Sequence, residues 1–92
     1  MSRLSGYPIV SETKDWGSID DGNELAEELT VPGASLGDFV LASMDVDVAD
    51  TMLTAAVTAA NTVTAVLANN TGGAIDLGSG TLRVRVVPFA DA

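Results

Sequence analysis

The chain has 92 residues, a length that suits one domain or one domain with a tail. It carries 13 acidic and 4 basic residues, for a formal net charge of −9. Nucleic-acid binding depends on clustered lysine and arginine, so this charge excludes a nucleic acid as a partner. Cysteine and histidine are absent, which excludes disulfides, thiol or imidazole catalysis, and a zinc site built on these residues.

The length also limits how stable an isolated domain can be. A chain this short removes only about 60–65% of its unfolded surface from water, and small domains without disulfides or metals are often stabilised by assembly. The longest mostly apolar stretch, residues 52–68, is interrupted by threonine and asparagine and is too short to span a bilayer. No secretory signal is visible at the N-terminus. We therefore expect no membrane partner, and either self-association or docking onto a larger body.

Residues 1–23 are dense in turn-forming residues and show no hydrophobic period, which predicts an extended N-terminal arm. Its apolar side chains are too many for a purely solvated tail, so the arm is expected to pack on its own domain or on a neighbour. The sequence leaves these two alternatives open. Tyr7 and Trp16 are large aromatic residues in a chain that has few, and such residues tend to be binding anchors.

Residues 24–92 contain short alternating segments separated by turn residues, which predicts strands. Alternation over residues 24–31 favours a strand narrowly over a short helix that Asn23 could cap. The next strand is expected over residues 39–46. Its first half is apolar on both faces, which suits burial on two sides or a subunit contact.

Residues 52–68 are rich in alanine, which favours helix, but also in β-branched threonine and valine, which favour strands. Asn61 interrupts the run at its middle and tolerates the left-handed conformation of a tight turn. We therefore predict a hairpin with strands over 52–59 and 62–68 and a turn near residues 60–61.

The last third of the chain is expected to contain two loops and one clear strand. Residues 69–73 and 78–80 are predicted loops, and residues 74–77 between them are expected to make a brief edge pairing. Residues 81–87 alternate most cleanly, and Pro88 ends this strand because proline cannot donate to a ladder. The predicted fold is all-β: a small β-sandwich of jelly-roll or immunoglobulin-like topology, with a sandwich domain over residues 24–92 behind the arm.

Two acidic clusters are candidates for a cation site. Residues 45–50 resemble a calcium loop, but an EF-hand needs glycine at its sixth position and glutamate at its twelfth, where Asp50 and Ala56 stand. A strand end with solvated carboxylates is the preferred interpretation, and residues 20–24 are interpreted as a turn. No arrangement of catalytic groups is specific enough to propose, so we expect no enzyme, no cofactor and no metal.

Arg83 and Arg85 lie on one face of the last predicted strand and are the only positive charges in residues 24–92. They are either exposed strand arginines or partners of Asp45 and Asp47, across a sheet or across a subunit boundary.

Five segments of the chain resemble a family of small virion proteins from tailed bacteriophages. They lie between residue 17 and the end of the sequence, a stretch of about four fifths of the chain, and they are residues 17–19, 33–40, 58–64, 69–76 and 80–86. The most specific part is Ala-Ala-Asn-Thr-Val-Thr at the predicted hairpin, followed by Asn-Asn-Thr-Gly-Gly-Ala-Ile-Asp. Proteins of this family look like β-sandwich modules of phage particles.

The resemblance implies a capsid decoration (cement) protein that binds the outer surface of the head and stabilises the capsid. It further implies synthesis in the host cytoplasm, the major capsid protein as partner, and assembly as a homotrimer. The residues expected at the capsid or subunit contact are Tyr7, Ile9, Val10, Trp16, Arg83 and Arg85. Two alternatives remain: a receptor- or glycan-binding module of a fibre or spike, and a bare oligomerisation domain.

Overall fold

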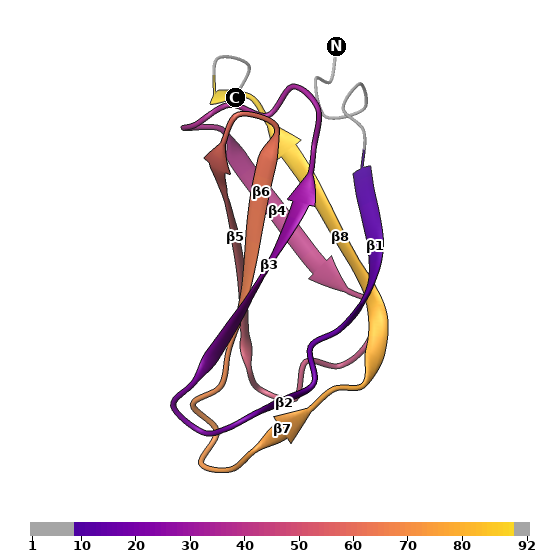
Figure 1. Cartoon of the computed structure of the whole chain (residues 1–92), viewed down its shortest axis with the longest axis vertical. Coiled ribbons are helices and arrows are strands. Elements are labelled where there is room, and N and C mark those ends of the chain that lie inside the picture. Colours follow the sequence, from indigo (N-terminus) through magenta and orange to yellow (C-terminus); the bar gives the residue numbers. More distant parts are fainter. Residues whose placement is uncertain (1–8, 90–92) are drawn as a thin grey trace.

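A computed structural model describes residues 9–89, and within them the chain folds into an all-β sandwich, as the sequence predicted. The strands are β1 (Ile9–Asp15), β2 (Ser18–Ile19), β3 (Glu24–Thr30), β4 (Phe39–Met44), β5 (Met52–Ala59), β6 (Thr62–Ala68), β7 (Ile75–Asp76) and β8 (Ser79–Val87). Two antiparallel three-stranded sheets have the orders β1-β8-β4 and β3-β6-β5, and the short ribbon β2-β7 lies at one end (Figure 1).

The core lies between the central strands of the two sheets. Leu82, Val84 and Val86 of β8 are buried, and so are Val63, Ala65 and Leu67 of β6. Burial alternates along β6 and along β8 from Thr81 on, so each strand places one face toward the other sheet. Six well-packed side chains from two strands thereby form the centre of a single small core.

β3 is a strand, so the helix alternative for residues 24–31 is wrong. It pairs with β6 along its whole length, from Glu24 opposite Ala68 to Thr30 opposite Thr62. This pairing buries Leu29 almost completely. The cross-strand contacts and burial outweigh the weak helical preference of the Leu and Glu residues.

The predicted hairpin is confirmed with its bounds, as β5 and β6. Asn61 at the turn has a positive φ of 63°, a conformation that asparagine tolerates better than most residues. Its backbone N–H donates to the Ala34 carbonyl at 2.9 Å, and its side-chain Oδ1 accepts from the Gly33 N–H at 2.8 Å. The turn therefore also holds the loop that leads from β3 to β4.

The predicted boundary between an arm and a sandwich after residue 23 is wrong. β1 pairs with β8 from Ile9 opposite Arg85 to Asp15 opposite Ser79, and β2 pairs with β7. Residues 9–19 therefore belong to the sandwich. The alternation was hidden because Glu12 and Lys14 occupy positions on the same side of β1 as the inward-facing Val10. The part of the predicted arm before residue 9 lies outside the described residues.

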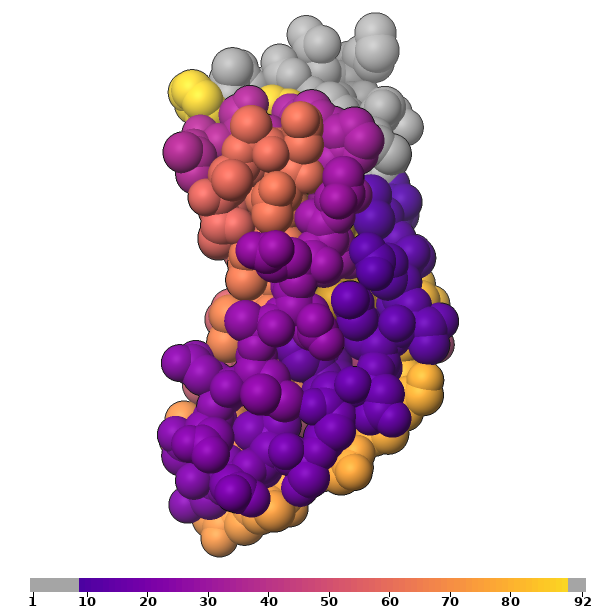
Figure 2. All heavy atoms as spheres, viewed as in Figure 1, coloured from indigo at the N-terminus to yellow at the C-terminus, as the bar shows by residue number. Residues whose placement is uncertain are grey.

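Glu12 and Lys14 of β1 lie along one edge of the sandwich, next to β3. The Lys14 ammonium lies 3.3 Å from the Glu12 carboxylate and 3.9 Å from that of Glu27 on β3. The space-filling view shows β1 in indigo lying against β3 in purple along the molecule (Figure 2). Charged residues that point inward at a sheet edge also discourage pairing with a further strand.

Three further predictions concern the ends of strands. The brief pairing expected in residues 74–77 is confirmed as β7. The loop predicted over residues 78–80 is wrong beyond Gly78, because Ser79 and Gly80 pair with Asp15 and Lys14 and begin β8. β4 ends at Met44, two residues before the predicted end.

The loop after β6 is organised by Asn69, whose side chain is fully buried. Its Nδ2 donates to the Ile19 carbonyl at 2.7 Å and to the Gly73 carbonyl at 2.8 Å. Its Oδ1 accepts from the backbone N–H and the hydroxyl of Thr71, at 3.0 and 2.8 Å. The Asn69-Asn70-Thr71 sequence, although it matches a glycosylation motif, is thus a structural tie at the β2-β7 end of the sandwich.

Candidate functional site

The described residues offer surfaces and shallow hollows as candidate sites. Within residues 9–89, no three acidic side chains come close enough together to hold a metal ion. The same part of the chain forms no helix long and apolar enough to cross a membrane.

Most of the exposed large apolar side chains gather at one end of the molecule and on the outer face of sheet β1-β8-β4. We call five of them, each between 51% and 67% exposed, the apolar patch: Ile9, Leu36, Phe39, Leu41 and Phe89. Only Leu25 and Met52 among the exposed large apolar residues of the described chain lie elsewhere. A concentration of exposed apolar side chains in one region is typical of a protein–protein interaction site.

The strand register brings the sheet residues of the patch together. Ile9 on β1 and Leu41 on β4 are both opposite Arg85 on the central strand β8. Phe39 is opposite Val87, close to the point where β8 ends. Residues that are more than 40 positions apart in the sequence therefore share one side of the sheet.

The remaining patch residues are held by the turn before β4. The carboxylate of Asp38 accepts from the Ser35 N–H at 3.0 Å and from the Phe89 N–H at 3.3 Å. Gly37 has a φ of +94°, and a Cβ at this position would lie 3.8 Å from the ring of Phe89. The turn that contains Leu36 and Asp38 thus holds the backbone of Phe89 beside it.

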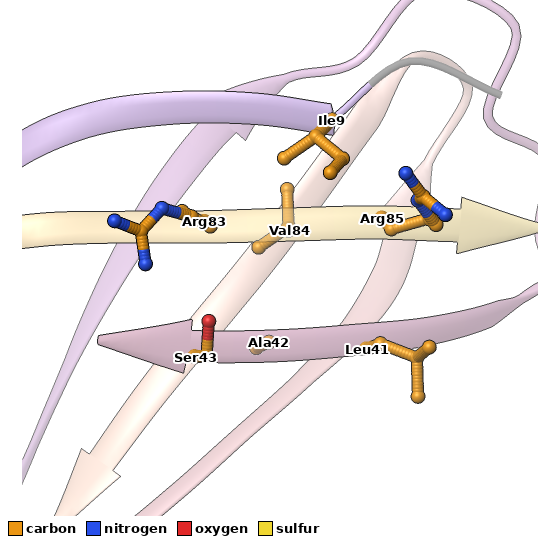
Figure 3. A pocket seen from close by; sticks show the side chains of 7 residues that line it. All are labelled: Ile9, Leu41, Ala42, Ser43, Arg83, Val84 and Arg85. Carbon is orange, nitrogen blue, oxygen red and sulfur yellow. The ribbon is translucent and has the colours of Figure 1, made fainter. Parts of the chain in front are cut away.

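Arg83 and Arg85 point outward from β8 next to the apolar patch, and we call them the arginine pair. Together with Ile9, Leu41, Ala42, Ser43 and Val84 they line a shallow hollow of about 290 Å³ (Figure 3). Within residues 9–89 no carboxylate lies within ion-pair distance of either arginine. The Nε of Arg85 is buried and has no hydrogen-bond partner among the described residues.

Asp45 and Asp47 do not pair with these arginines across the sheet. Oδ1 of Asp45 accepts from the Thr81 N–H at 2.8 Å, and Oδ1 of Asp47 accepts from the Ala49 N–H at 2.9 Å. The hydrogen bond from Thr81, helped by the more distant charge of Arg83, lowers the pKa of Asp45 below its usual value. Of the two arginines, Arg83 is exposed and Arg85 is half-buried, and neither pairs with these aspartates within the chain.

The structure places the predicted contact residues in three groups. Ile9, Arg83 and Arg85 lie together on the outer face of the sheet. Val10 packs against the core from the opposite side of β1, and Trp16 is only 4% exposed. These two are core residues of their own domain, so they are removed from the set of contact residues. Tyr7 lies outside the described residues.

Sequence reasoning missed most of the apolar patch. Phe39 and Leu41 carried a usable signal, because the first half of their strand is apolar on both faces and only one face can meet the core. Leu36 and Phe89 lie in a turn and after a proline, where no periodicity marks exposure. Their proximity depends on pairing between β4 and β8.

No protein-family model, no curated protein and no solved structure matches this chain.

Proposed function

We propose that this chain is a non-enzymatic structural protein of a tailed bacteriophage that decorates the outer surface of the head. The observation that carries the proposal is the apolar patch, which concentrates at one end of the sandwich the surface that a partner would cover. The resemblance of the five sequence segments to phage virion proteins supplies the identity of that partner, the major capsid protein.

Burial of the patch supplies a reasonable driving force for attachment. Covering a large apolar side chain that was fully exposed contributes about 1.5–3 kcal/mol, and these side chains are exposed by roughly half to two thirds. Part of this gain offsets the lost freedom of the bound protein. Many copies on a regular lattice, each attached by a modest contact, then brace the capsid, and assembly as a homotrimer would multiply the contacts of each unit.

A receptor- or glycan-binding role receives less support from the described surface. Glycan recognition would call for aromatic side chains that line a concave site, and the hollow beside the arginine pair is lined by none. The two exposed phenylalanines stand at the end of the sandwich instead. The proposed partner is therefore a protein surface.

The test is the binding of purified protein to phage heads prepared without it. We expect the double variant Leu36→Ser/Phe89→Ser to bind at least about tenfold more weakly than the unmodified chain, which corresponds to roughly 1.4 kcal/mol or more. Met52→Ser is the matched control, because Met52 is equally exposed but lies outside the patch. Bound copies per head are counted after sedimentation, and the midpoint of thermal rupture of the heads is measured in parallel.

Two results would contradict the proposal. The unmodified chain should saturate the heads and raise their rupture temperature, so a chain that does not sediment with them is not a decoration protein. If Met52→Ser weakens binding to heads as much as Leu36→Ser/Phe89→Ser does, the loss is not specific to the patch, and the patch is not the attachment surface.

A further inference from the structure

The arginine pair has a spacing that a particular kind of ligand would match. Two residues that are separated by one position on a strand point to the same side and lie about 6.6–6.8 Å apart along the strand. Arg83 is flanked in register by Ser11 and Ser43, and Arg85 by Ile9 and Leu41. Both side chains thus leave the same open face of the sheet, between small polar and aliphatic neighbours, and the Arg83 guanidinium reaches along β8 away from Arg85 (Figure 3).

The hydrogen-bonding capacity of the pair is not used by the described chain. Lys14, the other positive residue within residues 9–89, is engaged by two carboxylates. Among the residues that the structure describes, no carboxylate lies within ion-pair distance of Arg83 or Arg85, and no acceptor meets the buried Nε of Arg85. A guanidinium carries five N–H donors, so each arginine can still donate to an oxygen acceptor from a partner.

The surroundings of Arg85 would strengthen such a contact. Ile9 and Leu41 stand on its two sides and are each more than half exposed. A partner that covers them would exclude water from the guanidinium, and a charge pair is stronger where the local dielectric constant is low. The apolar and charged parts of the surface would therefore be covered by the same ligand.

The overall charge selects the chemistry of the ligand. In a chain of net charge −9, this face is the one part of the described surface that attracts an acidic protein, and such complementarity fixes the orientation of docking. A nucleic acid would meet two arginines and strong repulsion elsewhere. A second copy of this chain could offer the arginine pair Asp45 and Asp47, the acids of residues 9–89 with the matching spacing. Each of these carboxylates already accepts a backbone hydrogen bond within its own chain, which makes the second copy a weaker candidate.

We infer that the arginine pair binds an extended acidic segment of the partner protein, with two carboxylates spaced two residues apart and aliphatic neighbours that cover Ile9 and Leu41. The identity of that partner as the capsid protein rests on the proposed function. Recognition of the acidic segment itself is a property of this chain and is testable without heads.

The first experiment uses an isolated peptide as the probe. The capped peptide Glu-Val-Glu-Val-Glu is added to the full chain, and the side-chain Nε–Hε signals of the two arginines are followed by NMR. We expect both signals to shift in a saturable way with this peptide and to stay unchanged with the Gln-Val-Gln-Val-Gln analogue. Absence of a shift, or an equal shift with inorganic tripolyphosphate, would overturn the assignment to carboxylates.

The second experiment measures affinity for heads at about 50 and 200 mM salt, a range over which screening of surface charges changes strongly. We expect Arg83→Gln/Arg85→Gln to bind at least about tenfold more weakly at the lower salt and to lose most of the salt dependence. Arg83→Lys/Arg85→Lys should recover part of both. Glu24→Gln/Glu28→Gln removes the same number of charges from the outer face of β3 and should leave binding unchanged.

The outcomes separate the inference from the proposed function. If the unmodified chain fails to bind heads, the proposed function is wrong, and the peptide titration still decides the inference. If heads bind Arg83→Gln/Arg85→Gln with unchanged affinity and salt dependence, the inference is wrong and the proposed function stands. If instead Arg83→Gln/Arg85→Gln loses self-association in light scattering, the arginine pair binds a second copy of this chain, which also overturns the inference.

Discussion

Asn69 organises one end of this domain as a single residue. Its amide donates two hydrogen bonds and accepts two, which join the end of β6 to β2 and to the loop before β7. A buried polar side chain with all its partners present stabilises a fold, whereas its removal leaves the partners unsatisfied. Residues of this kind matter most in a domain with a small core.

We expect Asn69→Ala to lower the free energy of unfolding by about 3 kcal/mol, because the Ile19 and Gly73 carbonyls lose their donor inside the protein. Asn70→Ala is the matched control, since Asn70 is exposed and should change stability by less than about 0.5 kcal/mol. Urea unfolding followed by circular dichroism measures both variants. Similar midpoints for the two would show that Asn69 is not the tie described above.

Asp45 makes stability depend on pH in a defined direction. The hydrogen bond from the Thr81 N–H holds the pKa of the folded Asp45 below the unfolded value of 3.8. A carboxyl whose pKa is lowered on folding contributes stability that is present above the unfolded pKa and is lost as the pH falls through the folded pKa.

The prediction concerns the difference between the unmodified chain and Asp45→Asn, which cannot ionise at this position. At pH 7 the unmodified chain should have the higher urea midpoint, and the gap should close as the pH falls through the folded pKa of Asp45. Taking the difference removes the effect of the other acids, which titrate in both proteins. A gap that stays constant over this pH range would rule out a contribution from ionised Asp45.

At the scale of elements, β1 is as much a part of the sandwich as the strands of the predicted domain. It supplies one edge of sheet β1-β8-β4, and Lys14 links it to Glu27 of the other sheet. Trp16, directly after β1, is buried in the common core. An edge strand that carries a core aromatic residue at its end cannot act as a detachable arm.

Truncation distinguishes the strand from the residues before it. We expect deletion of residues 1–8 to leave the urea midpoint within the range of a surface change, and deletion of residues 1–18 to prevent folding. Loss of a buried tryptophan side chain alone costs about 3–5 kcal/mol, a large share of the 5–15 kcal/mol that stabilises a small domain. Circular dichroism and the urea midpoint of each truncated chain are the measurements.

The substitution Trp16→Ala separates the loss of β1 from the loss of its aromatic neighbour. It should fold at low temperature with a midpoint well below that of the unmodified chain. A stable, cooperative fold in the chain that lacks residues 1–18 would mean that β1 is dispensable. Experiments on the role of an N-terminal segment in attachment should therefore stop their deletions at residue 8.

At the scale of the whole molecule, one core joins all three β-structures. Trp16 and Ile19 from the first quarter of the chain, the β6 residues and the β8 residues belong to the same buried cluster. The molecule measures 44 × 21 × 19 Å, so its cross-section has room for just this one layer of side chains between the sheets. A domain built in this way has no part that can unfold without exposing the core.

We expect unfolding to be a single cooperative transition. Trp16 is the only tryptophan, so its fluorescence reports on the region of β1 and β2, while far-UV circular dichroism reports on all strands. The two urea curves should superimpose, as two-state behaviour requires. A fluorescence transition at lower urea than the circular dichroism transition would show that β1 and β2 separate from the remaining strands first.

The sequence by itself determined the all-β class, the hairpin with Asn61 at its turn, and the inward face of β8. These features depend on local patterns: alternation with a period of two, β-branched residues and a residue that tolerates positive φ. It also placed Arg83 and Arg85 on one face, because residues two positions apart on a strand always share a side.

The tertiary structure alone decided that residues 9–19 belong to the sandwich and that Trp16 serves the core. Glu12 and Lys14 stand on the same side of β1 as Val10 and break the local pattern, and the Lys14 ammonium lies near the carboxylates of Glu12 and of Glu27 from the other sheet. The apolar patch likewise unites residues from positions 9, 36–41 and 89 through the order β1-β8-β4. Strand order follows from which sheets bury the most apolar surface together, and no local stretch of sequence carries that information.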